Sequence, residues 1–204
     1  MMESKQPNSD SFDENQSLQV IREMIQVSQK KLKNDGILFI LWGWISFLTY
    51  FSEFVTTSIP HTFQLSKIKG YLTIIITIFG LGFTIAYLIQ QRRRAITYVS
   101  ISLRYVWGSV FLGMVLINLI QNNVLHKINF ELQLPIFMIL VSIALVITGG
   151  ILRYKMIIVG GIAFGLLAYL ASFFSLHVQL LIQSIAWLLA FIIPGHILYA
   201  KRKK

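Results

Sequence analysis

Three apolar stretches of the chain carry polar side chains near one end. If the stretches alternate in direction, these three ends lie at the same boundary of a helical bundle. At a rise of 1.5 Å per residue, these side chains lie within roughly 8 Å of one boundary of a helical bundle. Turned inward, their hydroxyl, amide and carboxylate groups would outline an outward-facing polar vestibule for a small ligand. Turned outward, they would face lipid headgroups, where shallow polar residues cost little. The residues are Thr49, Ser52 and Glu53, then Asn118 and Gln121, then Gln179 and Gln183.

Histidines are the second group that could do chemistry at this boundary. His61, His126 and His177 lie in its three connections, whereas His196 lies near the opposite boundary. Three neutral imidazoles can bind Zn²⁺ if their loops converge. The sequence has no HxH or HxxxH spacing, however, and solvated interfacial histidines explain the same pattern. We therefore predict no metal site.

Catalysis has few residues to use. Membrane enzymes and ion-coupled carriers usually place ionisable residues inside their spans, yet of the eight acidic residues only Glu53 falls within an apolar stretch. No HExxH, GxSxG, Walker or Rossmann motif occurs, and with no Cys there is no thiolate nucleophile. The sequence predicts no catalytic residue, no cofactor and no enzymatic activity.

The elements that carry these residues are membrane spans. The chain has 204 residues, of which 55% are hydrophobic and 13% charged, whereas a soluble domain carries about 25% charged residues. One small core cannot hide so much apolar surface, so lipid must cover it. A bilayer core needs about 20 apolar residues in helical form, because backbone polar groups in hydrocarbon must bond to one another. We expect an all-α polytopic protein with six spans, at about 37–57, 70–90, 101–121, 134–152, 156–174 and 178–199.

Basic residues alternate across these spans. Only Lys67, Lys69 and Lys127 lie on the side of the polar groups described above, and the other Lys and Arg residues lie on the opposite side. The positive-inside rule then places both termini in the cytoplasm. The net charge of +10 is used for orientation and for attracting anionic lipid headgroups at the cytoplasmic face, and we expect no nucleic-acid partner.

Residues 1–36 form a cytoplasmic head ahead of the transmembrane domain at 37–204. Its first residues are polar and predicted to be disordered, and an amphipathic helix is expected at about 13–34, because Leu18, Ile21 and Ile25 fall on one helical stripe. The stripe can lie on the inner leaflet of the bilayer. Alternatively, it can dock a protein partner or a second copy of the chain.

Small residues predict how the spans pack. Gly161 and Gly165 form a GxxxG pair, so the fifth span is expected at the centre of the bundle, the alternative being a homodimer contact through the same face. Pro194 is expected to kink the sixth span. Three tryptophans near cytoplasmic span ends are expected to anchor at the interface. They are Trp42, Trp44 and Trp107.

Two segments carry a resemblance to a known group of proteins. Residues 34–44 (NDGILFILWGW) and residues 192–196 (IIPGH), followed by a basic tail, resemble a family of small six-span bacterial inner-membrane proteins that has no assigned activity. The resemblance implies class and location, and no mechanism. We expect a non-catalytic integral protein of the bacterial inner membrane that acts by interaction, as a sensor or accessory subunit. The alternative is a small permease or channel-like carrier.

Overall fold

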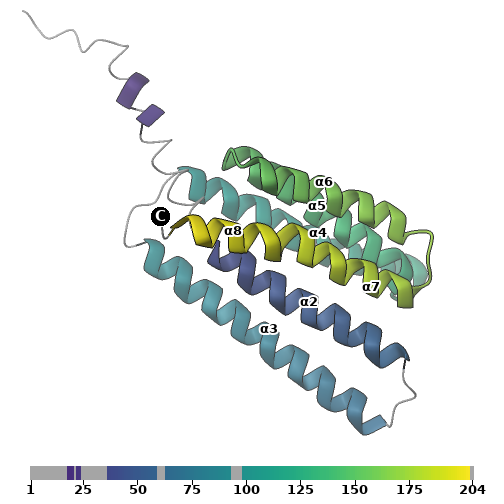
Figure 1. Ribbon diagram of the computed structural model, residues 1–204. Coiled ribbons are helices and arrows are strands. Elements are labelled where there is room, and N and C mark those ends of the chain that lie inside the picture. Colours follow the sequence, from purple (N-terminus) through teal and green to yellow (C-terminus); the bar gives the residue numbers. More distant parts are fainter. Residues whose placement is uncertain (1–17, 21, 24–35, 59–62, 93–97, 203–204) are drawn as a thin grey trace, which may run out of the picture.

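The computed structural model describes residues 18–20, 22–23, 36–58, 63–92 and 98–202, and within them all regular structure is helical. The long helices lie side by side along one common direction (Figure 1). In chain order they are α2 (Ile37–Ser58), α3 (Phe63–Arg92), α4 (Tyr98–Leu125), α5 (Phe130–Ile151), α6 (Lys155–Ala171), α7 (Leu176–Trp187), a π-helical segment η1 (Leu188–Ile192) and α8 (Ile193–Arg202).

Five helical segments are long and apolar enough to cross a membrane. They are α2, Ile68–Tyr87 of α3, Val99–Leu125 of α4, α5, and the continuous segment Leu176–Ala200. The expected fifth span corresponds to α6, which is apolar but only 17 residues long. The described chain is therefore an all-helical bundle compatible with a multi-pass membrane protein.

Two ends of the bundle are named below by their landmarks. The His177 end holds the last residues of α2, α4 and α6 and the first residues of α3, α5 and α7. The C-terminal end holds the opposite ends of these helices and α8 (Figure 1).

Several helices begin earlier than the apolar runs that predicted them. α3 starts at Phe63, so Lys69 lies on the helix and not in a connection before residue 70. α4 starts at Tyr98, three residues ahead of the expected start, and Arg104 lies on it with Nε donating to the Ser100 carbonyl at 3.3 Å. α5 starts at Phe130 because the Asn129 side chain accepts from two backbone N–H groups of its first turn. Caps and polar first turns extend a helix beyond its hydrophobic part.

The kink expected at Pro194 takes the form of a π-helical segment. Because proline has no N–H, it cannot donate to the carbonyl four residues earlier. η1 ends at Ile192, two residues before Pro194, and the Ile193 N–H reaches back to the Leu188 carbonyl, a five-residue bond. The predicted sixth span is therefore one continuous helical segment that runs from α7 through η1 to α8.

The fifth span is not the centre of the bundle, contrary to the GxxxG prediction. α6 packs against α5 through its small residues, and its opposite side is exposed, with Leu166 and Tyr169 each 66% accessible. The central position belongs to α7, η1 and α8, which contact α2, α6 and, through α7, α5. Small residues allow a close approach to one neighbour; they do not place a helix between several.

The GxxxG face itself packs inside the chain, as the first interpretation predicted. A Cβ on Gly161 would lie 2.9 Å from the backbone nitrogen of Val146, and a Cβ on Gly165 would lie 2.6 Å from Ser142 Oγ. Ser142 Oγ donates to the Gly161 carbonyl at 2.7 Å. This face is covered by α5 and is not free for a homodimer.

The turn between α5 and α6 is short, with Leu152 and Tyr154 buried and Arg153 exposed. Tyr154 N–H bonds to the Gly149 carbonyl and Arg153 N–H to the Gly150 carbonyl, with Arg153 at φ 50°, which is a Schellman motif. The Tyr154 hydroxyl donates to Met156 Sδ, and burial raises the pKa of this phenol above its ordinary value of 10.0. The α5–α6 hairpin is thus fixed at its turn as well as along its length.

The tryptophans and the head give a mixed outcome. Trp44 is exposed, whereas Trp42 Nε1 donates to Thr84 Oγ1 of α3 at 3.0 Å, and Trp107 packs edge-on against Phe191 of η1. Trp42 and Trp107 therefore pack against neighbouring helices, and their position relative to the membrane interface stays a prediction. The amphipathic helix predicted at 13–34 lies mostly outside the described residues. Within this range only 18–20 and 22–23 are described, and they are helical.

Candidate functional site: polar groups at the His177 end

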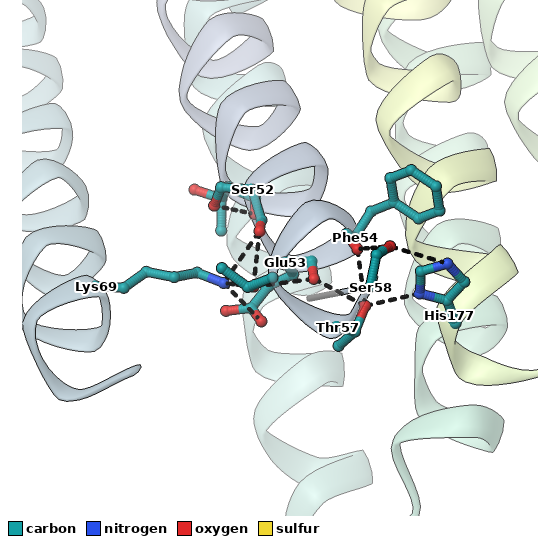
Figure 2. A network of polar contacts seen from close by, with 9 residues as sticks. Ser52, Glu53, Phe54, Thr57, Ser58, Lys69 and His177 are labelled. Carbon is teal, nitrogen blue, oxygen red and sulfur yellow. Dashed lines mark hydrogen bonds and ion pairs between the residues drawn. The ribbon is translucent and has the colours of Figure 1, made fainter. Parts of the chain in front are cut away.

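Glu53 and Lys69 form an ion pair between α2 and α3. Lys69 Nζ lies 2.9 Å from Glu53 Oε2 and donates to the Ser52 carbonyl at 3.2 Å and to the Thr56 hydroxyl. Figure 2 shows the lysine reaching across from α3 to the last turns of α2. The Lys69 side chain is 18% exposed and that of Glu53 46%, so the pair is partly solvated and adds little to stability. Its main effect is to hold the first turns of α3 against α2.

His177 binds the other side of the same α2 turns. Its Nδ1 lies 2.7 Å from Thr57 Oγ1 and its Nε2 lies 3.4 Å from Ser58 Oγ, while its ring stacks on Phe54 at 4.4 Å between centroids. The Thr57 hydroxyl also lies within hydrogen-bond distance of the Glu53 and Phe54 carbonyls of its own helix. The end of α2 thus lies between Lys69 on one side and His177 on the other (Figure 2).

A second polar group joins α4 and α5. Gln133 Nε2 donates to Asn118 Oδ1 at 2.6 Å, and Gln121 Oε1 accepts from the Asn129 backbone N–H at 2.9 Å. Gln121 and Gln133 are each 5% exposed. These amides hold the α4–α5 connection and complete the N-terminal cap of α5.

The third group is buried on α7. Gln179 and Gln183 are 2% and 3% exposed, and Gln179 Nε2 donates to the Phe174 carbonyl at 2.9 Å. The Tyr50 side chain of α2 lies near that of Gln183. Both glutamine Oε1 atoms lack a hydrogen-bond partner among the described residues.

The residues predicted to form one vestibule therefore separate into three groups. Glu53 binds Lys69, Asn118 and Gln121 serve the α4–α5 contact, and Gln179 and Gln183 face the bundle interior beside α2. The hydroxyls of Thr49 and Ser52 donate to backbone carbonyls of α2, so Ser52 joins the Glu53–Lys69 group only through its carbonyl. All three groups lie at the His177 end, as the common boundary predicted.

The histidines are not brought together in the described part of the chain. His177 binds α2, His126 lines a shallow open depression on the last turns of α4, and His196 Nδ1 contacts the Ile192 carbonyl near the C-terminal end. His61 lies outside the described residues. Among those residues, no three His, Asp or Glu side chains lie close enough together to hold a metal ion.

Sequence reasoning missed several partners of the residues it selected. Lys69 and Gln133 each lie at the edge of a predicted span, where they were counted as connection residues, yet both bind selected residues across a helix hairpin. Trp187 follows Gln179 and Gln183 at the same four-residue spacing, a helical stripe that is visible in the sequence. For Tyr50, the sequence indicated only its depth along the first span and not that it lies near Gln183.

Comparison with known proteins adds no assignment. The chain matches no protein-family model, no curated protein and no solved structure.

Proposed function

We propose that this chain is a non-catalytic, six-span integral protein of the bacterial cytoplasmic membrane that acts by contacting other proteins, as a sensor or accessory subunit. Five apolar helices of spanning length support membrane insertion, and the 17 residues of α6 meet the lower limit for a sixth span. With an even number of crossings, the distribution of basic residues places both termini in the cytoplasm and the His177 end outside.

The position of α3 carries the proposal of action by interaction. α3 contacts the described chain chiefly through α2, and the rest of its surface is apolar and exposed, with Ile75 at 63% and Phe79 at 69%. Figure 1 shows α3 at the margin of the bundle, beyond α2. Membrane helices associate through close van der Waals packing, and α3 has little of it with the described part of the chain. A helix from a partner protein would supply the missing contact.

Photocrosslinking in cells tests this proposal. A photoreactive amino acid at Phe79 is expected to give a discrete protein adduct, whereas the same group at Leu166 of α6, which is 66% exposed, serves as a lipid-facing control. Protein adducts of equal yield at both positions, or at neither, would contradict a specific contact through α3.

The cytoplasmic head offers a second contact in this proposal. A protein truncated to begin at Gly36 should still insert, and loss of a partner that otherwise co-purifies in mild detergent would assign docking to the head. Retention of the partner would leave α3 as the docking element. A dimer of this chain would appear in the crosslinking experiment as an adduct of twice the mass, and in mild detergent as a complex of that mass.

The alternative proposal is a small permease or channel-like carrier, and the buried glutamines of α7 favour it. A carrier needs a polar path through the bundle, and these glutamines supply polar atoms only in the half nearer the His177 end. In the other half, a Cβ on Gly43 would lie 2.8 Å from Ile192 Cγ1, so α2 and η1 are in direct contact. Cysteines placed at Asn118 and Gln183 test access: a carrier vestibule predicts that an impermeant thiol reagent labels both from outside.

A further inference from the structure

Three buried polar atoms of α7 form a stripe with no protein partner. Gln179, Gln183 and Trp187 are spaced by four residues, so they lie about 6 Å apart along one face of the helix. Gln179 Oε1, Gln183 Oε1 and Trp187 Nε1 are buried, and the described residues provide no hydrogen-bond partner for any of them. Each such atom costs about 1–3 kcal/mol unless something binds it, so three on one face call for a common explanation.

The orientation of the first amide is fixed by its own contact. Because Gln179 Nε2 donates to the Phe174 carbonyl, its Oε1 must be the free atom, and it can only accept. Indole Nε1–H of Trp187 can only donate. The stripe therefore offers hydrogen-bond acceptors nearer the His177 end and a donor deeper in the bundle.

Aromatic side chains of α2 and α6, together with His177 at the start of α7, lie around this stripe. The Tyr50 hydroxyl lies beside Gln183, and Phe164 of α6 meets the Trp187 ring edge-on at 5.5 Å. At the His177 end, His177 stacks on Phe54. Counted from that end, Tyr50 and Gln183 lie at nearly the same depth in the antiparallel helices α2 and α7.

The seam is closed at its deeper end. A Cβ on Gly43 would lie 3.0 Å from Phe191 Cβ, so α2 rests directly on η1 just below Trp187. The π-helical segment begins at Leu188, immediately after the stripe, and such segments often occur at functional sites. This contact closes the seam on the C-terminal side of the stripe, so a molecule reaching the stripe would come from the His177 side.

The charge of the site selects the ligand class. Glu53 and Lys69 neutralise each other on the α3 side of α2, away from His177 (Figure 2). The three side chains of the stripe are themselves uncharged, two amides and one indole. An ion entering here would lose its water without gaining an opposite charge, whereas a neutral molecule would not.

We propose that Gln179, Gln183 and Trp187 bind a small uncharged molecule that carries N–H or O–H donors and a carbonyl or hydroxyl acceptor, entering from the His177 end. Primary amides, urea and short alcohols share this chemistry. A molecule of this size spans one turn of α7, so it donates to Gln183 Oε1 and accepts from the Trp187 indole N–H, and Gln179 Oε1 offers a second acceptor one turn nearer the His177 end. This inference does not depend on the contact proposed for α3, and the two are tested separately.

Indole NMR of the full-length protein in micelles, with acetamide as the probe, tests the site. The Trp187 indole N–H signal, assigned by its loss in Trp187→Phe, is expected to shift saturably with acetamide. N,N-dimethylacetamide, which has no N–H donor, is expected to leave it unshifted. A shift that does not saturate, or the same response to both amides, would overturn the proposal. An indole N–H that exchanges with water and does not shift with acetamide would also overturn it.

Variants assign the effect to the stripe. Gln183→Leu removes one acceptor at similar volume and is expected to weaken acetamide binding about tenfold, the effect of losing one hydrogen bond. Gln133→Leu is the matched control, because Gln133 is equally buried but bonds to Asn118. Equal affinities in the two variants would overturn the proposal. If Gln183→Leu does not fold, the pair of amide probes on the unmodified protein decides it.

Discussion

The α2–α3 and α5–α6 hairpins of this bundle are joined by different kinds of contact. α5 and α6 touch backbone to backbone at Gly149 and Gly161, and Ser142 adds a buried hydrogen bond. α2 and α3 are joined by polar side chains at two points, Trp42 with Thr84 and Glu53 with Lys69. In a bilayer, where apolar burial gives no net gain between helices, close packing gives a rigid hairpin and scattered polar contacts a replaceable one.

The exposure of the helices agrees with this difference. α5 is buried over ten of its positions, including Met138, Leu145 and Thr148, whereas the described side chains of α3 are largely exposed. The only buried residue that α3 shows in its described part is Gly80. The α5–α6 hairpin is thus part of the core, and α3 is a helix whose place can be shared with a partner.

The largest expected effect comes from adding one methyl group between α5 and α6. In Gly161→Ala the new Cβ would meet Leu145 Cβ and the Val146 backbone nitrogen, each at 2.9 Å, and neither can move without shifting α5. We expect the free energy of unfolding in mixed micelles to fall by about 1–3 kcal/mol. Gly150→Ala, where nothing lies within 4 Å, is the control; equal stability of the two variants would refute the rigid contact.

The polar contact between α2 and α3 is expected to be weaker. Trp42→Phe and Thr84→Val each remove one partner of the 3.0 Å hydrogen bond. A double-mutant cycle should give a coupling free energy of about 0.6 kcal/mol, the usual value for such bonds in membrane proteins. Hydrogen exchange should rise in α3 and stay constant in α5. Additive effects of the two substitutions would show that the bond contributes nothing.

A smaller effect is expected from the ion pair. Glu53→Gln removes the charge opposite Lys69, whose Nζ keeps its bonds to the Ser52 carbonyl and the Thr56 hydroxyl. Because both side chains are partly exposed, the loss should be a few tenths of a kcal/mol and should shrink as salt concentration rises. Unfolding midpoints of variant and parent at low and high salt measure this. A loss that is independent of salt would point to a different cause.

The smallest loss of stability is expected from Gly80→Ala on α3. The new Cβ would lie 2.6 Å from Ile45 Cδ1, a nominally closer contact than that at Gly161, but this atom is the tip of a flexible side chain. A change of rotamer relieves it, and alanine gains about 1 kcal/mol of helix propensity over glycine. Unfolding free energies should match those of Gly82→Ala, which meets open space. A cost as large as that of Gly161→Ala would make the two hairpins equivalent.

Much of the helical architecture could be predicted from apolar runs alone. The runs at 37–57 and 101–121 lie within α2 and α4, and those at 134–152 and 178–199 differ from helical segments by a few residues. Helix ends were less predictable, because Asn129 and the polar first turn of α3 extend helices beyond their apolar parts. The shared boundary of the polar residues was also predicted correctly, since rise per residue fixes depth along a helix.

Which polar residues meet could not be predicted in the same way. Depth follows from position in the chain, but the facing of a helix depends on its neighbours. Asn118 therefore bonds to Gln133 of α5 and not to the glutamines of α7, and Glu53 bonds to Lys69, a residue outside the predicted span.

The sequence by itself determined that the chain is a bundle of apolar helices and at which end its polar groups lie, because both follow from composition and from distance along each helix. Only the tertiary structure decided that α7, η1 and α8 take the centre, that α3 stays at the margin, and that Gln179, Gln183 and Trp187 are buried without partners. These outcomes depend on which helix faces pack together, and that choice is made by shape between segments far apart in the chain.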